Sequence, residues 1–239
     1  MAQNSVTEPT FISQYRKCFD ATWSDDTAID RVRFVVLDTE TTGLNPRTDR
    51  IITIGAVAVQ NGELRLDDSF EALLKVTQNT SSVTVHGVTR DESRMGMEEP
   101  LVLALLLNYL KDGVIVGHHI GHDIATLGEA YDRHWGCRML NRTLDTMDLA
   151  LHLARDGAFS GRPQFRKFTL DALCEAFGVI PHDRHTASGD AFMTAMVFLR
   201  LRRLALRYGR ERLGRICEPF EEASSGQLEA AVKRVSNSP

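Results

Sequence analysis

Residues 35–45 read Val35-Val36-Leu37-Asp38-Thr39-Glu40-Thr41-Thr42-Gly43-Leu44-Asn45. The apolar run indicates a buried strand over residues 34–38, and the period of two along a strand places Asp38 and Glu40 on one face. Two carboxylates fixed side by side repel each other unless a cation lies between them. Oxygen ligands of this kind favour Mg²⁺ or Mn²⁺. Because acids at a strand end often only face water or cap a turn, a metal site requires partners elsewhere in the chain.

Two later segments supply such partners. An apolar strand expected over residues 114–117 precedes Asp123, which therefore lies near a strand-to-helix junction before a helix over residues 124–135. Further on, His185 and Asp190 flank the expected start of a helix over residues 187–207. One Asp at a helix start is often only an N-cap. Four carboxylates and one histidine, each near an element end, instead predict one shared site.

Three motifs, in this order along the chain, resemble the DEDDh 3′–5′ exonucleases, a family that includes the proofreading epsilon subunit of DNA polymerase III and ribonuclease T. They are Asp38-Thr39-Glu40-Thr41-Thr42-Gly43-Leu44, Gly117-His118 through Asp123, and His185 through Asp190. Residues 85–89, 144–146 and 169–174 also match the family's pattern. The resemblance covers residues 33–204 and departs from the pattern at His119 and His122, where the family usually has Asn and Phe. An imidazole at these positions bears on substrate preference, through its packing against a base or its response to pH near neutrality.

The order of expected elements agrees with the fold that this resemblance implies. Strands are expected over residues 34–38, 51–60, about 70–76, 114–117 and 142–144, with a tight Asn61-Gly62 turn after the second. Helices are expected over residues 11–22, 98–111, 124–135, 146–155, 169–177 and 187–207. This order predicts an α/β protein with a mixed five-stranded sheet and helices on both faces. The resemblance implies that this is the ribonuclease H-like fold. The expected organisation is a helical N-terminal extension over residues 1–30, an exonuclease domain over 31–207 and a helical tail over 208–239.

The resemblance also assigns roles to residues. The expected catalytic residues are Asp38, Glu40, Asp123, His185 and Asp190, and the four carboxylates among them are the expected ligands of two divalent metal ions, Mg²⁺ or Mn²⁺. By resemblance, Asp38 bridges both ions, while Asp123 supports the side of the leaving group. His185 is the expected general base, a role that suits its near-neutral pKa. The implied activity is hydrolysis of phosphodiester bonds from the 3′ end of single-stranded DNA, which releases nucleoside 5′-monophosphates.

Contacts to the substrate follow from the same motifs. Backbone amides of Thr41, Thr42 and Gly43 are expected to hold the terminal hydroxyl and phosphate, with Leu44 as a wedge between the last bases. Such contacts ignore base identity. His86 and His118 resemble the family's sugar and base contacts. Asp145, by contrast, is expected only to cap the helix that begins at Thr146.

Composition indicates a soluble, cytoplasmic protein. The net charge is −4, so attraction to nucleic acid must be local. The four cysteines show no metal-binding spacing and are expected to be reduced thiols. The longest apolar run, residues 101–107, is too short to cross a bilayer, and no membrane partner is expected. Seven arginines lie within residues 200–215. They are interpreted as the solvated face of an amphipathic helix rather than as a phosphate-tracking ridge.

Alternatives remain at this stage. The group His118, His119, His122 and Asp123 is similar to the metal ligands of HD-domain phosphohydrolases, but those domains are wholly helical. A catalytically silent nucleic-acid-binding module is disfavoured because all the expected catalytic residues are present. RNA or short oligoribonucleotides stay open as substrates, since discrimination depends on what surrounds the 2′-hydroxyl. A DNA polymerase subunit and a second copy of the chain, in a homodimer, stay open as partners.

Overall fold

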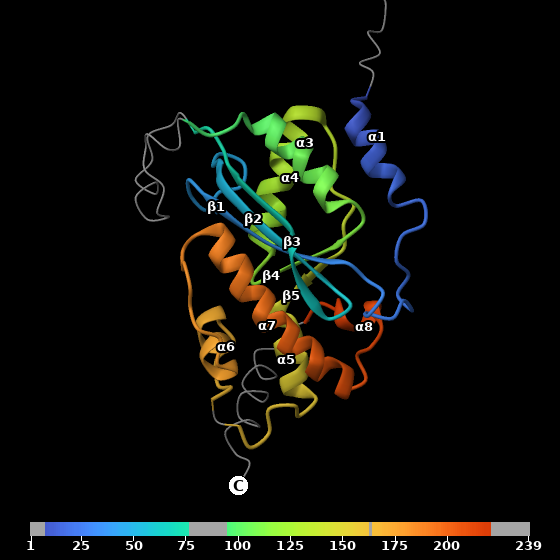
Figure 1. Cartoon of the computed structure of the whole chain (residues 1–239), viewed down its shortest axis with the longest axis vertical. Coiled ribbons are helices and arrows are strands. Elements are labelled where there is room, and N and C mark those ends of the chain that lie inside the picture. The colour runs from blue at the N-terminus through green and yellow to red at the C-terminus, as the bar shows by residue number, and fades with distance from the viewer. Residues whose placement is uncertain (1–7, 77–94, 163, 221–239) are drawn as a thin grey trace, which may run out of the picture.

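The centre of the molecule is a mixed five-stranded sheet in the order β3-β2-β1-β4-β5 (Figure 1). The computed structural model describes residues 8–76, 95–162 and 164–220. Its strands are β1 (Phe34–Thr41), β2 (Ile51–Gln60), β3 (Glu63–Leu73), β4 (Val114–Gly117) and β5 (Thr143–Asp145). β1, β2 and β3 are antiparallel, whereas β4 and β5 extend the sheet parallel to β1. The predicted mixed sheet of an α/β protein is confirmed.

Helices cover both faces of this sheet (Figure 1). One face packs against α1 (Thr10–Lys17), α3 (Glu99–Leu110) and α4 (Gly121–Trp135). The other packs against α5 (Thr146–Arg155), α6 (Leu170–Phe177), α7 (Ala187–Arg207) and α8 (Leu213–Ile216). No helix in the described ranges combines the length and the apolar character needed to cross a membrane.

The alternation of side chains along β1 explains this layering. Phe34 and Val36 join the apolar cluster that holds α7, whereas Val35 and Leu37 join the cluster that holds α3 and α4. Because the strand period is two, the residues that continue the first series face α7. β1 therefore delivers the side chains of Asp38 and Glu40 to the α7 face, where β1 ends.

The strands differ from the sequence prediction mainly at their ends. The predicted turn is present, with φ of 54° at Asn61 and 75° at Gly62, as a tight hairpin requires. β3 begins directly after it, at Glu63, rather than near residue 70. β1 continues to Thr41 instead of ending at Asp38, because its acidic end still pairs with β2. The helix predicted over residues 11–22 is shorter, since α1 ends at Lys17.

The arginine-rich segment over residues 200–215 is not one continuous helix. α7 ends at Arg207, and Gly209 has a φ of +72° before α8 begins. The side chain of Arg210 is only 2% exposed and donates to Asp156 Oδ2 at 2.8 Å. Arg202 is also buried and pairs with Asp30. The prediction of a solvated cationic face is wrong for these two arginines, because their acidic partners are distant in sequence.

We expect Arg210→Ala to lower the free energy of unfolding by about 3 kcal/mol. The change removes the partner of the Asp156 carboxylate and of the Arg215 carbonyl, which accepts from Nη1 of Arg210 at 3.0 Å. Urea denaturation measures the effect. Arg203→Ala is the matched control, since Arg203 is exposed and should change stability by less than about 0.5 kcal/mol. Equal losses in the two variants would contradict a structural role for the buried pair.

Candidate active site

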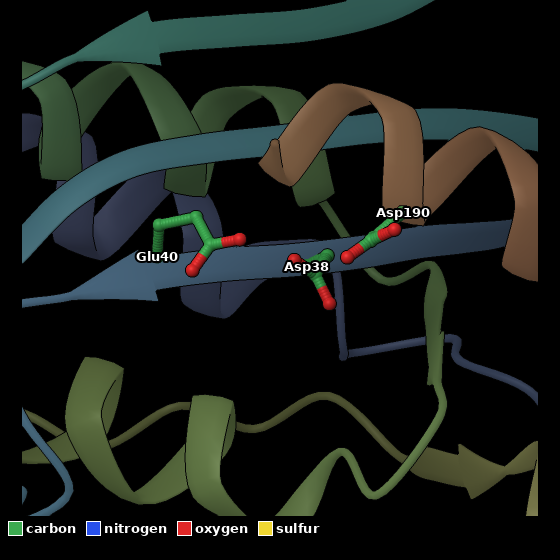
Figure 2. A group of neighbouring side chains, drawn as sticks. All are labelled: Asp38, Glu40 and Asp190. Atoms are coloured by element: carbon green, nitrogen blue, oxygen red, sulfur yellow. The ribbon is translucent and has the colours of Figure 1, made fainter. Parts of the chain in front are cut away.

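Three carboxylates converge where β1 meets the start of α7. Asp38 and Glu40 of β1 and Asp190 of α7 point toward one another (Figure 2). One oxygen from each lies within 4.8 Å of the oxygens offered by the other two. Asp190 lies in the first turn of α7, which begins after Thr186, whose Oγ1 accepts from the amide of Gly189 at 3.1 Å. The cluster thus joins a strand end to a capped helix start.

Gly55 of β2 permits this close approach. It pairs directly with Asp38 across the sheet. A Cβ placed on Gly55 would lie 2.3 Å from the backbone nitrogen of Ser188 and 2.5 Å from the carbonyl oxygen of Ala187. The first turn of α7 therefore packs directly on the β2 backbone, which sets the distance between Asp190 and Asp38.

Asp123 reaches the same end of the sheet from the opposite face. α4 begins at Gly121 rather than at residue 124, so Asp123 lies in its first turn. Its Oδ1 accepts from the Thr39 amide at 2.8 Å and from the Thr39 hydroxyl at 2.6 Å. Burial raises the pKa of Asp123 to about 6, although these hydrogen bonds act in the opposite direction. Asp123 is not one of the three carboxylates that share the 4.8 Å cluster, but its charge raises the pKa of both Asp38 and Glu40.

The site carries an excess of negative charge on buried and partly buried carboxylates. Burial raises the pKa of Asp38 well above its usual range, and the charges of Asp123, Asp190 and Glu40 raise it further. Burial, followed by the charges of Asp190 and Asp123, raises the pKa of Glu40 to about 7. A divalent cation among these oxygens would offset both the cost of burying these charges and the repulsion between them. Carboxylates are also the ligands that such ions prefer. The donor set fits a divalent metal ion.

We expect Mn²⁺ to raise the Tm more at pH 8 than at pH 5.5. A carboxyl whose pKa is higher in the folded state binds protons preferentially when folded, so the metal-free protein loses stability as pH rises. For Glu40 this window runs from about 4.5 to about 7. Below pH 7 an ion must also displace the proton bound to the Glu40 carboxyl. At saturating Mn²⁺ we expect a rise of roughly 5–10 °C at pH 8 and much less at pH 5.5, measured by thermal unfolding. Equal rises at both pH values would contradict metal binding by these carboxylates.

The expected general base lies in an exposed loop. His185 has a φ of +64°, and its side chain is exposed. Within the described ranges it makes no hydrogen bond. The structure thus leaves its imidazole available without showing it in contact with the carboxylates, and the catalytic role of His185 stays a prediction.

The turn after β1 is ordered by an acid that sequence reasoning missed. Asp49 accepts from the Thr42 hydroxyl at 3.1 Å and from the Asn45 amide at 2.8 Å. Thr41 donates its hydroxyl to the Gly43 carbonyl at 2.7 Å. Between these anchors the Leu44 side chain is 87% exposed. An exposed leucine on an ordered turn is compatible with the predicted wedge.

His118 lies at the end of β4, and its protonation state follows from its partners. The Thr146 hydroxyl donates to the Gly117 carbonyl at 3.1 Å, so it accepts from His118 Nδ1 at 2.9 Å. Burial, followed by the charge of His119, lowers the pKa of His118 to about 4. The ring is therefore neutral near pH 7, with a buried Nε2 that has no hydrogen-bond partner among the described residues. His86, the other predicted sugar or base contact, lies outside the described residues.

Asp145 has the capping role predicted for it. Its carboxylate accepts from the Met147 amide at 2.8 Å at the start of α5. It also accepts from the amides of His119 and Ile120, which leave β4. Asp145 thereby fixes the backbone of the second motif instead of entering the carboxylate cluster.

A mixed sheet that carries a carboxylate cluster where β1 meets α7 fits the predicted ribonuclease H-like fold. The model of the exonuclease family matches residues 35–198. The PolC-type DNA polymerase III of Thermotoga maritima is 36% identical over 181 residues, which cover 74% of this chain and 12% of the polymerase. That of Thermotoga petrophila is 34% identical over 197 residues, which cover 81% of this chain and 14% of the polymerase. The chain belongs to the exonuclease family, and the predicted membership of the DEDDh 3′–5′ exonucleases is confirmed.

A solved structure shows the same fold. Escherichia coli exonuclease I in complex with a dT13 oligonucleotide matches with a TM-score of 0.63 at 18% identity. The match covers 84% of this chain and 46% of that one. The chain thus spans only 12–14% of the length of the polymerases named above and less than half of exonuclease I.

Proposed function

We propose that this chain is a metal-dependent exonuclease that shortens single-stranded DNA from its 3′ end and releases nucleoside 5′-monophosphates. The convergence of Asp38, Glu40 and Asp190 within 4.8 Å carries the proposal. Two relatives support DNA as the substrate, since one is a DNA polymerase and the other was solved with an oligonucleotide of dT. A polymerase as partner, a homodimer and a cytoplasmic location stay predictions.

In this proposal Asp38, Glu40, Asp123 and Asp190 hold two divalent ions, Mg²⁺ or Mn²⁺. When bound, such ions lower the pKa of a water and neutralise the charge that develops on the phosphate. Thr39 fixes the orientation of Asp123 through two hydrogen bonds. β1 and α7 fix the other three carboxylates, so the protein supplies ligands that are already arranged.

The remaining residues act on the water and on the strand. His185 accepts the proton of the attacking water at an imidazole nitrogen, which requires its exposed ring to turn toward the carboxylates. The turn that Asp49 orders presents the amide of Gly43 to the 3′ end, with Leu44 against the last base. The predicted contact from the Thr42 amide is not available in this structure, because that amide donates to the Arg50 carbonyl at 2.9 Å. His118 can accept from a sugar hydroxyl at the unpaired Nε2 of its neutral ring, which requires that this buried atom be uncovered when the strand binds.

The test uses 5′-labelled single-stranded DNA and RNA of matched sequence with Mg²⁺ or Mn²⁺. We expect a one-nucleotide ladder that shortens the DNA from its 3′ end and that Asp123→Ala abolishes. Preferential cleavage of the RNA would show that RNA, and not the proposed single-stranded DNA, is the substrate. No cleavage of either strand, with metal binding intact, would overturn the proposed function.

A second variant separates metal binding from proton transfer. His185→Ala should lose most turnover while Mn²⁺ binding, measured by calorimetry, stays unchanged, because His185 is not one of the proposed ligands. Unchanged turnover would remove His185 from the role of general base.

A further inference from the structure

Arg184, which sequence reasoning did not single out, lies directly on the carboxylate cluster. Its Nη1 donates to Asp190 Oδ1, and its Nε donates to Asp171 Oδ1 at 2.9 Å. The Asp190 side chain is 11% exposed and that of Arg184 is 24% exposed, so this ion pair is largely shielded from solvent. Asp171, on α6, is an exposed acid that holds the guanidinium from the outer side.

The backbone around Arg184 is held in an uncommon conformation. The residues on either side of it, Asp183 and His185, have φ of 47° and 64°. Non-glycine residues in the left-handed region are strained and persist only when their surroundings fix them. Here the Thr186 hydroxyl donates to the Asp183 carbonyl at 2.7 Å, and a Cβ on Gly189 would lie 2.1 Å from the Asp183 oxygen. The loop is therefore packed so that Arg184 reaches Asp190.

The charge of Arg184 acts on the whole cluster. It lowers the pKa of both Asp38 and Glu40, in opposition to burial and to the neighbouring carboxylates. A guanidinium is planar, permanently charged and weakly hydrated, which suits it to a partly buried pair with a carboxylate. It thus neutralises part of the charge that a divalent ion would otherwise neutralise.

We propose that Arg184 is the resident counter-cation of the metal-free site and sets its metal affinity by competing with a divalent ion for Asp190. The inference rests on the proposed metal-dependent function. An ion bound to Asp190 competes with the guanidinium for the same carboxylate, and it also meets the repulsion of a fixed positive charge. Asp171 retains the displaced guanidinium beside the site. Arg184 thereby stabilises the metal-free protein and weakens metal binding.

The test measures the Kd for Mn²⁺ by calorimetry and the Tm without metal, in wild type and in Arg184→Gln. We expect Arg184→Gln to bind Mn²⁺ about 10-fold more tightly while its metal-free Tm falls, because Asp190 loses the cation with which it pairs. Arg184→Lys keeps the charge and should keep the Kd near that of wild type. Weaker Mn²⁺ binding in Arg184→Gln would show that Arg184 supports the ligands and would overturn the proposal, as would an unchanged Kd with a lower Tm.

Arg203→Gln is the matched control, since it removes the same charge from an exposed position farther along α7. Its Kd for Mn²⁺ should equal that of wild type. If Arg203→Gln also bound Mn²⁺ 10-fold more tightly, the effect of Arg184 would come from the overall charge of the protein, and the inference would be overturned. The cleavage assay reports separately on the proposed function. If wild type binds Mn²⁺ but cuts no nucleic acid, that function fails while the Kd values still decide the inference.

Discussion

Asp38→Asn is expected to remove hydrolysis almost completely and yet to make the metal-free protein more stable. We expect a loss of activity of about 1,000-fold or more, because the substitution removes the carboxylate at the centre of the proposed ligand set. We also expect the metal-free Tm at pH 8 to rise by roughly 4 °C. Both effects have one cause, the concentration of negative charge on the carboxylates of the site.

The physical reason lies in the pKa of Asp38. Burial and three neighbouring carboxylates raise it well above its usual range, so the folded protein favours the neutral form. At pH 8 the unfolded chain ionises this group freely, whereas the metal-free folded protein opposes its ionisation, and this difference lowers the stability of the folded protein. Asn has the same shape without the charge, and the cost disappears. A metal ion removes the same cost in wild type, so the advantage of the variant should vanish at saturating Mn²⁺.

Thermal unfolding with and without Mn²⁺, together with the cleavage assay, measures both effects. Asp67→Asn is the control, because Asp67 is an exposed acid of β3 paired only with Arg65 among the described residues, and it should change neither quantity. A lower metal-free Tm in Asp38→Asn would contradict the inference that the charges of this site destabilise the metal-free protein.

Features set by local geometry could be predicted from the sequence. The period of a strand predicts that Asp38 and Glu40 share one face. Asp145 is predicted to cap the helix that begins at Thr146, and the structure confirms it. The predicted start of α4 is three residues later than the observed one, because the N-cap position holds Ile120, which makes no capping hydrogen bond through its side chain. A helix without a capping side chain gives no signal for its first residue.

Features set by tertiary packing could not be predicted in this way. The hydrogen bonds from Thr39 to Asp123 join a strand of the sheet to α4, which packs on one face of it, across 84 positions of sequence. The pair of Arg184 with Asp190 depends on two left-handed residues that nothing in the local sequence specifies. Gly55 lies within the strand predicted over residues 51–60, and only the packing of α7 on β2 shows that a larger side chain has no room there.

Gly55→Ala, a substitution on β2, should therefore lower the turnover of a site whose ligands lie on other elements. The added Cβ would lie 2.3 Å from the Ser188 nitrogen and 2.4 Å from the Ala187 carbonyl carbon, and both are backbone atoms that no rotamer change can move. The first turn of α7 must then move away from the sheet, which increases the distance between Asp190 and Asp38. A displacement of about 1 Å costs roughly 100-fold in turnover. Overpacking should lower the free energy of unfolding by about 1–3 kcal/mol.

Calorimetry with Mn²⁺, urea denaturation and the cleavage assay test this expectation. Gly128→Ala is the matched control, since a Cβ on Gly128 of α4 meets no atom within 4 Å, and alanine should stabilise that helix by up to about 1 kcal/mol. If Gly55→Ala lost stability but kept the Mn²⁺ affinity and turnover of wild type, the packing of α7 on β2 would not set the distance between Asp38 and Asp190. The joint loss of affinity and turnover, with every predicted ligand still present, would show that the absence of a side chain at Gly55 is as necessary to the site as its carboxylates.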